Sequence, residues 1–297
     1  MAQQNATREL RLHGGIHKTG STYLQLCFAR NRALLRARGL AVYGPSELRP
    51  VTARFFRRPR PDLTEEEQAR FAKDLGKIVD FDASEATVLS QENMIGTIKF
   101  FVRRGKLYPT APGVLRGLSA ILPRPVTSIH LCLRDFPSYL ASAYIEYIRT
   151  QPFLSFEDFV AKADLSALSW VPLVRTFGRV FKGAAMEVWD YEFFRRDPSA
   201  VIDGILGRPL AGDLDLGGLN QRPSASAAVI AEMARIAERA GPEAARDAMA
   251  ALEKAHPPGP GVPRFDPWEA AEVTALRGLY RQDLETLDGL RWVRLRT

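Results

Sequence analysis

The stretch LRLHGGIHKTGSTYLQ, from Leu10 to Gln25, constrains the fold more than any other part of the chain. Leu10 and Leu12 indicate a short buried strand, which a pair of glycines ends. From Thr22 onward the apolar residues have helical spacing until Gly39. A strand, a glycine-punctuated loop and a helix N-terminus form an anion site, because the loop amides converge on the anion and the helix dipole adds partial positive charge.

The position of the lysine distinguishes this loop from that of nucleotide-hydrolysing enzymes. Gly15 and Gly20 have the spacing of G-x-x-x-x-G-K-[ST], but Ser21 follows the second glycine, and Lys18 precedes it. A lysine at that position lies across the top of the loop, so the magnesium-holding geometry of an NTPase is not reproduced. Gly20 admits a phosphate close to the backbone, and Ser21 and Thr22 offer hydroxyls and early-helix amides. The simpler alternative is a glycine turn that joins strand and helix.

Strands and helices alternate along the chain. We expect further strands at 40–43, 86–90, 126–133 and 186–190. Helices are expected at 64–79, within 98–123, at 137–149, 155–164 and 168–181, from 198, and from 224 onward, with a loop at 256–267. The proline- and arginine-rich stretch 48–63 is expected to be irregular. This alternation predicts an α/β fold, a three-layer sandwich with a central parallel sheet and a P-loop, as one domain with a helical C-terminal part from about 224.

Composition supports a globular chain with an anionic ligand. The 297 residues carry a formal net charge of +7, mostly through arginine, which suits phosphate but does not separate a nucleotide from an acidic glycan or nucleic acid. No apolar run is long enough to span a bilayer, and the first residues lack the apolar core of a secretion signal. Cys27 and Cys132 are far apart, and the four histidines lack metal-ligand spacing. We therefore expect a cytoplasmic, soluble and metal-free protein.

A second group of polar residues follows the strongest predicted strand. Arg134 stands at the end of that strand, and Pro137 is at a helix-starting position. Ser142 lies eight residues after the arginine, on the helix that follows. Because ligands of open α/β sheets bind beyond the carboxyl ends of the strands, Arg134 is expected to reach the same crevice as the first loop.

The order HKTGST resembles the 5′-phosphosulfate loop of the sulfotransferases that use 3′-phosphoadenosine-5′-phosphosulfate (PAPS). The resemblance implies that the side chains and amides of one short run hold the phosphosulfate, and that no metal is needed. That run is Lys18, Thr19, Gly20, Ser21 and Thr22. In this family an arginine at a strand end and a serine eight residues later bind the 3′-phosphate, here Arg134 and Ser142.

Three motifs in the family's order span positions 13–198, about two thirds of the chain. The third, WDYEFFRRDP, is similar to the segment whose tyrosine lies near the adenine, here Tyr191. One departure is the proline, which stands third after the arginine where the family more often has it second, so Ser138 is a further candidate for the 3′-phosphate. The family's closing RKG-type loop is absent, and Arg222 in LNQRPSAS is the candidate replacement, with Ser224 as the cap of the next helix.

As a member of this family the chain would transfer a sulfuryl group from PAPS to the hydroxyl or amine of an acceptor such as a carbohydrate or small metabolite. Three residues are candidates for the base that accepts the acceptor's proton. Glu92 is the first choice because it follows a clear strand. Glu47 is the second, because its spacing from the loop resembles that of the carbohydrate-modifying members. His17 is the third.

Two other classes of function stay open at this point. One is a P-loop kinase that uses ATP and magnesium, against which the displaced lysine argues. The other is a catalytically silent protein that holds a nucleotide or an anionic polymer on the same fold. A nucleic-acid-binding role depends on net charge alone, without interleaved aromatic residues, and is set aside.

Overall fold

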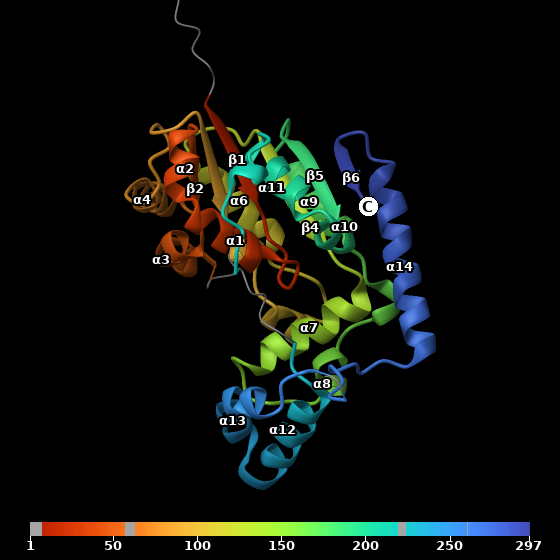
Figure 1. Cartoon of the computed structure of the whole chain (residues 1–297). Coiled ribbons are helices and arrows are strands. Elements are labelled where there is room, and N and C mark those ends of the chain that lie inside the picture. Colours follow the sequence, from red (N-terminus) through yellow and green to blue (C-terminus); the bar gives the residue numbers. More distant parts are fainter. Residues whose placement is uncertain (1–7, 57–62, 219–223, 260) are drawn as a thin grey trace, which may run out of the picture.

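The computed structural model describes residues 8–56, 63–218, 224–259 and 261–297, with the side chains of 52–56 left aside. In these residues a central sheet of six parallel strands has the order β2-β3-β1-β4-β5-β6 (Figure 1). The strands are β1 (Glu9–His13), β2 (Leu40–Tyr43), β3 (Ala86–Ser90), β4 (Ser128–Leu133), β5 (Ala185–Asp190) and β6 (Val293–Arg296).

The register brings the carboxyl ends of the three central strands to one edge of the sheet. His13, the last residue of β1, pairs with Ser90 at the end of β3 and with His130 in β4, which continues to Leu133. The segments that leave these strands therefore emerge at the same edge of the sheet. The P-loop, the turn at Glu92 and the segment at Arg134 are brought together by this register alone.

Helices cover both faces of the sheet, as predicted for a three-layer α/β fold. One apolar cluster joins the sheet to α1 (Ser21–Arg30), α2 (Arg32–Ala37), α10 (Tyr191–Arg196) and α11 (Pro198–Leu206). The cluster on the other face takes residues from α3 (Pro45–Phe56), α4 (Glu65–Gly76), α5 (Lys99–Arg104), α6 (Ala111–Ile121), α7 (Phe136–Ile148), α9 (Val171–Val180) and α14 (Ala270–Asp288). None of the helices in the described ranges is long and apolar enough to cross a membrane.

The second cluster continues beyond the sheet into a helical unit. α8 (Phe156–Val160), α12 (Ala227–Ala240) and α13 (Pro242–Ala255) lie past the carboxyl end of the sheet, at the bottom of Figure 1. Phe153 donates its amide to the Pro242 carbonyl at 3.0 Å, which ties the start of α13 to the segment after α7. The long helix α14 then runs back along the sheet and leads into β6.

Locally encoded elements match their predictions. The helix predicted from residue 64 is α4, and a capping box begins it: the Thr64 hydroxyl accepts from the Glu67 amide at 3.2 Å and the Glu67 carboxylate accepts from the Thr64 amide at 3.1 Å. The strand predicted at 86–90 has those bounds as β3. The helix predicted to begin near Pro137 is α7, with Asp135 as its N-cap.

The prediction of an irregular stretch at 48–63 is wrong for its first half. Helix α3 (Pro45–Phe56) includes Pro50, and residues 57–62 lie outside the described ranges. Leu48 and Val51 are buried in the core, and we attribute the helix to this burial, which outweighs the hydrogen bond that the proline removes.

Two further differences concern element ends. The first helix, predicted as continuous to Gly39, is divided at Asn31, whose side chain bonds the Cys27 carbonyl at 2.9 Å and ends α1. Strand β6 was not predicted. It is an edge strand with alternating arginines, and the partner that makes it a strand, β5, lies a hundred residues away in the sequence.

Candidate active site

The loop between β1 and α1 has an unusual backbone. Lys18 adopts φ +66° and Gly20 φ +86°, both in the left-handed region, which is rare for a side chain as long as lysine. A Cβ atom at Gly20 would lie 2.3 Å from the Phe194 ring, so glycine is required there for space as well as for conformation. The Thr19 side chain is buried and its hydroxyl donates to the Ile16 carbonyl at 2.6 Å, so this hydroxyl holds the loop together.

The N-terminus of α1 is open toward the loop. Gly20 is its N-cap, and no capping side chain in the described residues bonds the first-turn amides. The amides of Ser21 and Thr22 belong to the first turn, whose N–H groups have no partner within the helix. A helix end of this kind attracts an anion through its N–H groups and through the partial positive charge of the dipole.

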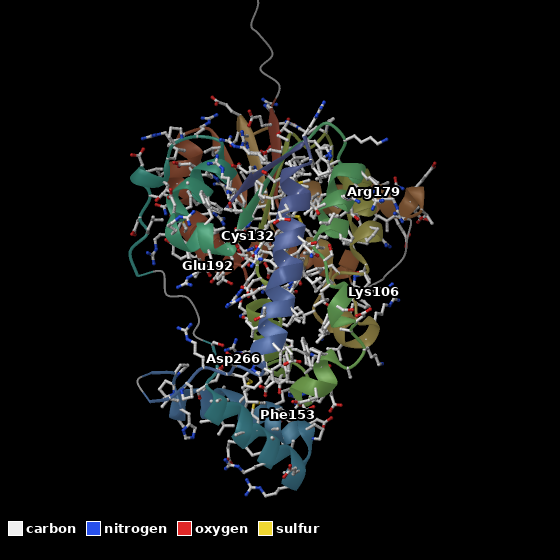
Figure 2. All side chains as sticks on the ribbon, turned by 90° about the vertical axis from the view of Figure 1, so that its right-hand side faces the viewer. Lys106, Cys132, Phe153, Arg179, Glu192 and Asp266 are labelled. Atoms are coloured by element: carbon white, nitrogen blue, oxygen red, sulfur yellow. The ribbon has the colours of Figure 1, made fainter. Side chains whose placement is uncertain are left out.

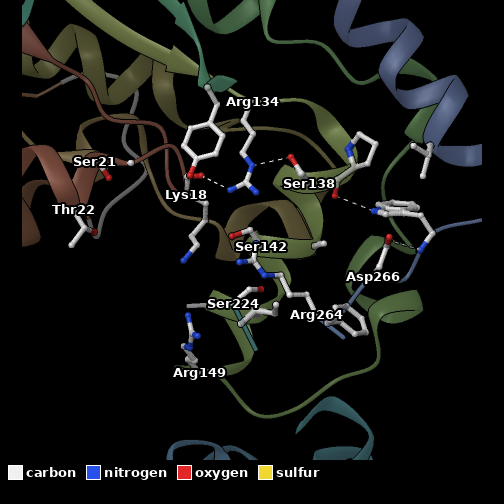
Figure 3. A pocket seen from close by; sticks show the side chains of 18 of the residues that line it. Lys18, Ser21, Thr22, Arg134, Ser138, Ser142, Arg149, Ser224, Arg264 and Asp266 are labelled. Atoms are coloured by element: carbon white, nitrogen blue, oxygen red, sulfur yellow. Dashed lines mark hydrogen bonds between the residues drawn. The ribbon is translucent and has the colours of Figure 1, made fainter. Parts of the chain in front are cut away.

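Arg134 joins the end of β4 to the loop. Its Nη1 donates to the Lys18 carbonyl at 2.8 Å, and its Nε donates to the Ser138 hydroxyl at 2.9 Å (Figure 3). The guanidinium carbon lies 4.6 Å from the centroid of the Tyr191 ring, which completes a cation–π contact. Burial lowers the pKa of Arg134, and Tyr191 and Asp135 oppose this, so the group stays a cation with a fixed orientation.

The loop, Arg134 and α7 face one cavity of about 580 Å³ (Figure 3). Most of the residues predicted to bind the cosubstrate line this cavity: Lys18, Gly20, Ser21, Thr22, Arg134, Ser138, Ser142 and Tyr191. The sequence did not reveal the rest of the lining, which includes Arg149 at the end of α7, Arg277 of α14 and an opposite wall with Arg264, Phe265, Asp266 and Trp268. The cavity has the size of a typical small-ligand site and an excess of cationic side chains.

The segment before α14 forms that opposite wall. Phe265 donates its amide to the Ala225 carbonyl at 3.2 Å, and Trp268 donates its indole N–H to the Pro137 carbonyl at 3.0 Å, so the segment bridges α12 and α7. Arg264 directly precedes the first of these anchors, forms an isolated antiparallel bridge with Ser226 and lines the cavity. An arginine set among prolines was the available signal, but 256–267 was interpreted only as an interruption between helices.

The expectation for the C-terminal closure is partly wrong. The cap of α12 is Ser226, whose hydroxyl accepts from the Val229 amide at 3.4 Å, and Ser224 instead lines the cavity. Arg222 lies outside the described residues. Sequence reasoning chose the wrong serine because both stand directly before the helical pattern.

Alternating charges connect the P-loop lysine to the helical unit. The Lys18 ammonium lies 3.5 Å from a Glu146 carboxylate oxygen, and Arg149 lies 3.3 Å from the same oxygen. Arg149 also pairs with Glu253 of α13 at 2.5 Å, and only 7% of its side chain is exposed. Burial lowers the pKa of Lys18, and the nearby Glu146 raises it. The chain Lys18–Glu146–Arg149–Glu253 thus fixes one wall of the cavity.

A second, smaller cavity of about 250 Å³ lies on the other side of the α1 N-terminus. Thr22 lines both cavities, whereas Glu47 and Glu92 line only this one. Glu92, in the short 3-10 turn η1 (Glu92–Ile95), accepts from the Gln25 amide at 2.9 Å and pairs with Arg49 at 3.1 Å. Burial raises the pKa of Glu92, but these hydrogen bonds outweigh it, so the net pKa is lowered and the carboxylate is ionised at neutral pH.

The Glu47 carboxylate is occupied by its own surroundings. One oxygen accepts from the Gly44 amide at 3.0 Å and from the Ser46 hydroxyl at 2.8 Å, and the other is paired with Arg32. Burial raises the pKa of Glu47, and these bonds lower it further than burial raises it. With both oxygens engaged, Glu47 organises the start of α3.

His17 faces away from both cavities. Its Nδ1 lies 2.8 Å from the Tyr108 hydroxyl, and its Nε2 lies 3.2 Å from the Asn93 side-chain oxygen. Burial lowers the pKa of His17, and the nearby Glu92 raises it, so that the net pKa lies below the ordinary value. Since both ring nitrogens have partners, His17 holds the loop against Tyr108 and η1.

No family model and no curated protein matches the chain. Among solved structures, the chain is similar to the crystal structure of a sulfotransferase from Alicyclobacillus acidocaldarius, at 18% sequence identity and a TM-score of 0.43. The match covers 83% of this chain and 96% of that one.

Proposed function

We propose that this chain is a sulfotransferase that takes its sulfuryl group from PAPS and transfers it to a hydroxyl or amine acceptor. One observation carries the proposal. Lys18 and Arg134, 116 residues apart in sequence, are joined by a hydrogen bond and face the same cavity beside an uncapped helix N-terminus. This arrangement offers two anion sites, one at the loop and one at the end of β4.

The donor matches the cavity in size and in charge. Its phosphosulfate would bind at the loop, against Lys18 and the first amides of α1. Its 3′-phosphate would bind Arg134 with Ser138 and Ser142, whose hydroxyls line the same wall. Arg134 is oriented in advance by its bonds to the loop and to Ser138, so little side-chain entropy is lost on binding.

The reaction would be an in-line displacement at sulfur. The acceptor atom forms a bond to sulfur while the bond from sulfur to the bridging oxygen breaks, and the electron pair stays on the 5′-phosphate. Lys18 and the amides of the loop then stabilise the negative charge on that oxygen. For this step the Lys18 ammonium exchanges Glu146 for the donor.

The smaller cavity would hold the acceptor. Thr22 separates the two cavities, so a group held beside Glu92 faces a sulfuryl group held at the loop. Glu92 would accept the proton that the attacking hydroxyl or amine loses, since it is ionised and its partner Arg49 has a 61% exposed side chain that is able to move aside. Glu47, bound on both oxygens, is the weaker candidate.

Ligand-induced stabilisation tests the donor site. Adenosine 3′,5′-bisphosphate, the expected product, should raise the melting temperature, and ATP with magnesium at the same concentration should raise it much less. An Arg134→Lys variant should lose the bisphosphate effect, because lysine does not reproduce the paired donors of the guanidinium. A larger shift from ATP with magnesium would contradict the proposal and favour a kinase.

Two matched variants test the base. Glu92→Gln should lower turnover by about 100-fold or more while leaving bisphosphate stabilisation unchanged, since a general base contributes typically about 10²–10⁴ in rate. Glu47→Gln removes the same charge and should lower stability more than turnover. The opposite ranking would move the base to Glu47, and bisphosphate binding without transfer to a broad acceptor panel would indicate a silent binding protein.

A further inference from the structure

A second basic region lies at the opposite end of the sheet. It surrounds a hollow of about 800 Å³ between α9 and the segment that joins α14 to β6, which we call the far basic cavity. Five cationic side chains line it: Arg175, Arg179, Lys182, Arg291 and Arg294. Arg175 and Arg179 are one helical turn apart on α9 and therefore share a face.

This cavity is separate from the candidate active site. It is lined by Ala185 and Met186 at the start of β5, whereas Tyr191 directly follows the end of that strand. The six residues of β5 span about 20 Å at about 3.3 Å per residue, so both sites can be filled at once. Figure 2 shows the separation, with Arg179 near the top of the molecule and Asp266 of the candidate active site near the helical unit.

The cations of the far basic cavity lack the acidic partners found elsewhere. No carboxylate lines the cavity, and within the described residues none of its five cations forms an ion pair. In the part of the chain that the structure describes, Arg179 bonds only the Thr176 hydroxyl, at 3.2 Å. Several exposed arginines on other faces are paired, for example Arg38 with Asp213 at 2.9 Å. Like charges gathered without partners repel one another. A bound anion would reduce this repulsion, which no acidic side chain in the described residues offsets.

An exposed aromatic ring completes the region. Trp292 has 42% of its surface exposed, one of two large apolar residues so exposed in the described residues. Its ring lies against Gly178 of α9, where a Cβ atom would come within 2.6 Å of the ring. Glycine thus lets the indole approach the backbone of α9 closely, in the same cavity as the two arginines of that helix.

We infer that the far basic cavity binds a narrow polyanionic chain of the acidic-polysaccharide class. Repeated carboxylate or sulfate groups along such a chain would meet the five cations, and a sugar ring would lie on Trp292. The concave shape disfavours a membrane, whose surface does not enter a hollow. A single aromatic residue disfavours single-stranded nucleic acid, which binds by stacking successive bases. The inference does not depend on the proposed reaction.

Binding of a fluorescent heparin decasaccharide tests the inference. Arg179→Gln, Lys182→Gln and Arg294→Gln combined should weaken binding by about 30-fold, taking about threefold for each exposed charge, the scale of a surface ion pair. The matched control combines Arg235→Gln, Arg239→Gln and Arg246→Gln, which removes three paired charges from α12 and α13, two of them exposed and one half-exposed. The control should bind the decasaccharide within about twofold of the original chain.

Three outcomes would overturn the inference. Equal weakening in both triple variants would show attraction by net charge alone. Tighter binding of a single-stranded oligonucleotide, or of vesicles rich in phosphatidylserine, would assign the surface to another partner. Trp292→Ala leaves the charge unchanged and should weaken decasaccharide binding several-fold, and an unaltered affinity would remove the ring from the site. Bisphosphate stabilisation, measured in every variant, should stay unchanged and reports folding and the donor site separately.

Discussion

The two basic regions hold their charges in different ways. Around the P-loop, Arg134 is bonded to the loop and to Ser138, and Arg149 is buried between two carboxylates. In the far basic cavity the cations are exposed and lack acidic partners in the described residues. A fixed set of donors selects one small ligand by geometry, whereas a diffuse set attracts a long anion by charge. We therefore expect similar residue types to serve different kinds of recognition in the two regions.

The sharpest test of the fixed region is Lys18→Ala. We expect turnover to fall by about 10²–10³, the loss typical of removing one group that stabilises developing charge. The bisphosphate should still bind, because Arg134 and the α1 amides remain. The measurement is the initial rate of sulfuryl transfer with a responsive acceptor. An unchanged rate would remove Lys18 from the chemistry.

Arg179→Ala is the counterpart in the far basic cavity and should leave that rate unaltered. It removes the same charge at the other end of the sheet, so it controls for net charge. A comparable fall in both variants would mean that the two regions are not independent.

The fixed region should also make stability depend on pH. Burial lowers the pKa of His13 to about 4 from its ordinary 6.5, with Glu92 opposing the shift. The unfolded chain therefore takes up a proton first as the pH falls, and the free energy of unfolding should decrease by about 3 kcal/mol between pH 6.5 and 4. The lining of the far basic cavity contains no histidine, so it adds nothing to this pH dependence of stability.

Urea unfolding at pH 7, 5.5 and 4.5 would measure this dependence. His13→Asn keeps a polar contact to Ser90, which lies 2.8 Å from the ring in the original chain, and should reduce the slope. Part of the slope should remain in this variant, because burial also lowers the pKa values of His17 and His130. A variant with the full slope would contradict the assignment to His13.

Sequence reasoning reached the part of the site that local patterns and strand ends determine. The loop with Lys18 follows from residues within one short stretch, and Arg134 reaches the crevice because it ends a strand of the same parallel sheet. The opposite wall depends on how α12, α13 and the segment before α14 pack. Arg264 comes to the cavity through contacts with residues far away in the chain, which no local pattern encodes.

The same limit explains the errors in the fold. Helix α3 forms around Pro50 because its apolar residues are buried by neighbours, and β6 exists because β5 lies beside it. The far basic cavity could not be predicted from the sequence for a similar reason. Its arginines are contributed by α9 and by the α14–β6 connection, more than 100 residues apart, and only the sheet brings them together.

Replacing one arginine in each region should change stability unequally. Arg149→Gln leaves Glu253 and Glu146 without their buried partner, and we expect a loss of about 2 kcal/mol, less than for a fully buried pair because both carboxylates are partly exposed. Arg179→Gln should stay within about 0.5 kcal/mol of the original chain. Urea denaturation measures the free energy of unfolding of both variants. Equal losses would contradict the contrast between the paired, buried Arg149 and the exposed Arg179.

The smallest effect is expected from Glu146→Gln. Glu146 is a carboxylate beside a cavity proposed to bind anions, and it holds the Lys18 ammonium at 3.5 Å. Its removal frees Lys18 and lowers the negative charge near the bisphosphate, so the bisphosphate should bind about threefold more tightly, the scale of a partly exposed pair. Calorimetric titration of the bisphosphate measures this, with Glu253→Gln as a control that removes the same charge without touching Lys18. Weaker binding in Glu146→Gln alone would give Glu146 the opposite role, because Lys18 would then need this carboxylate to point into the cavity.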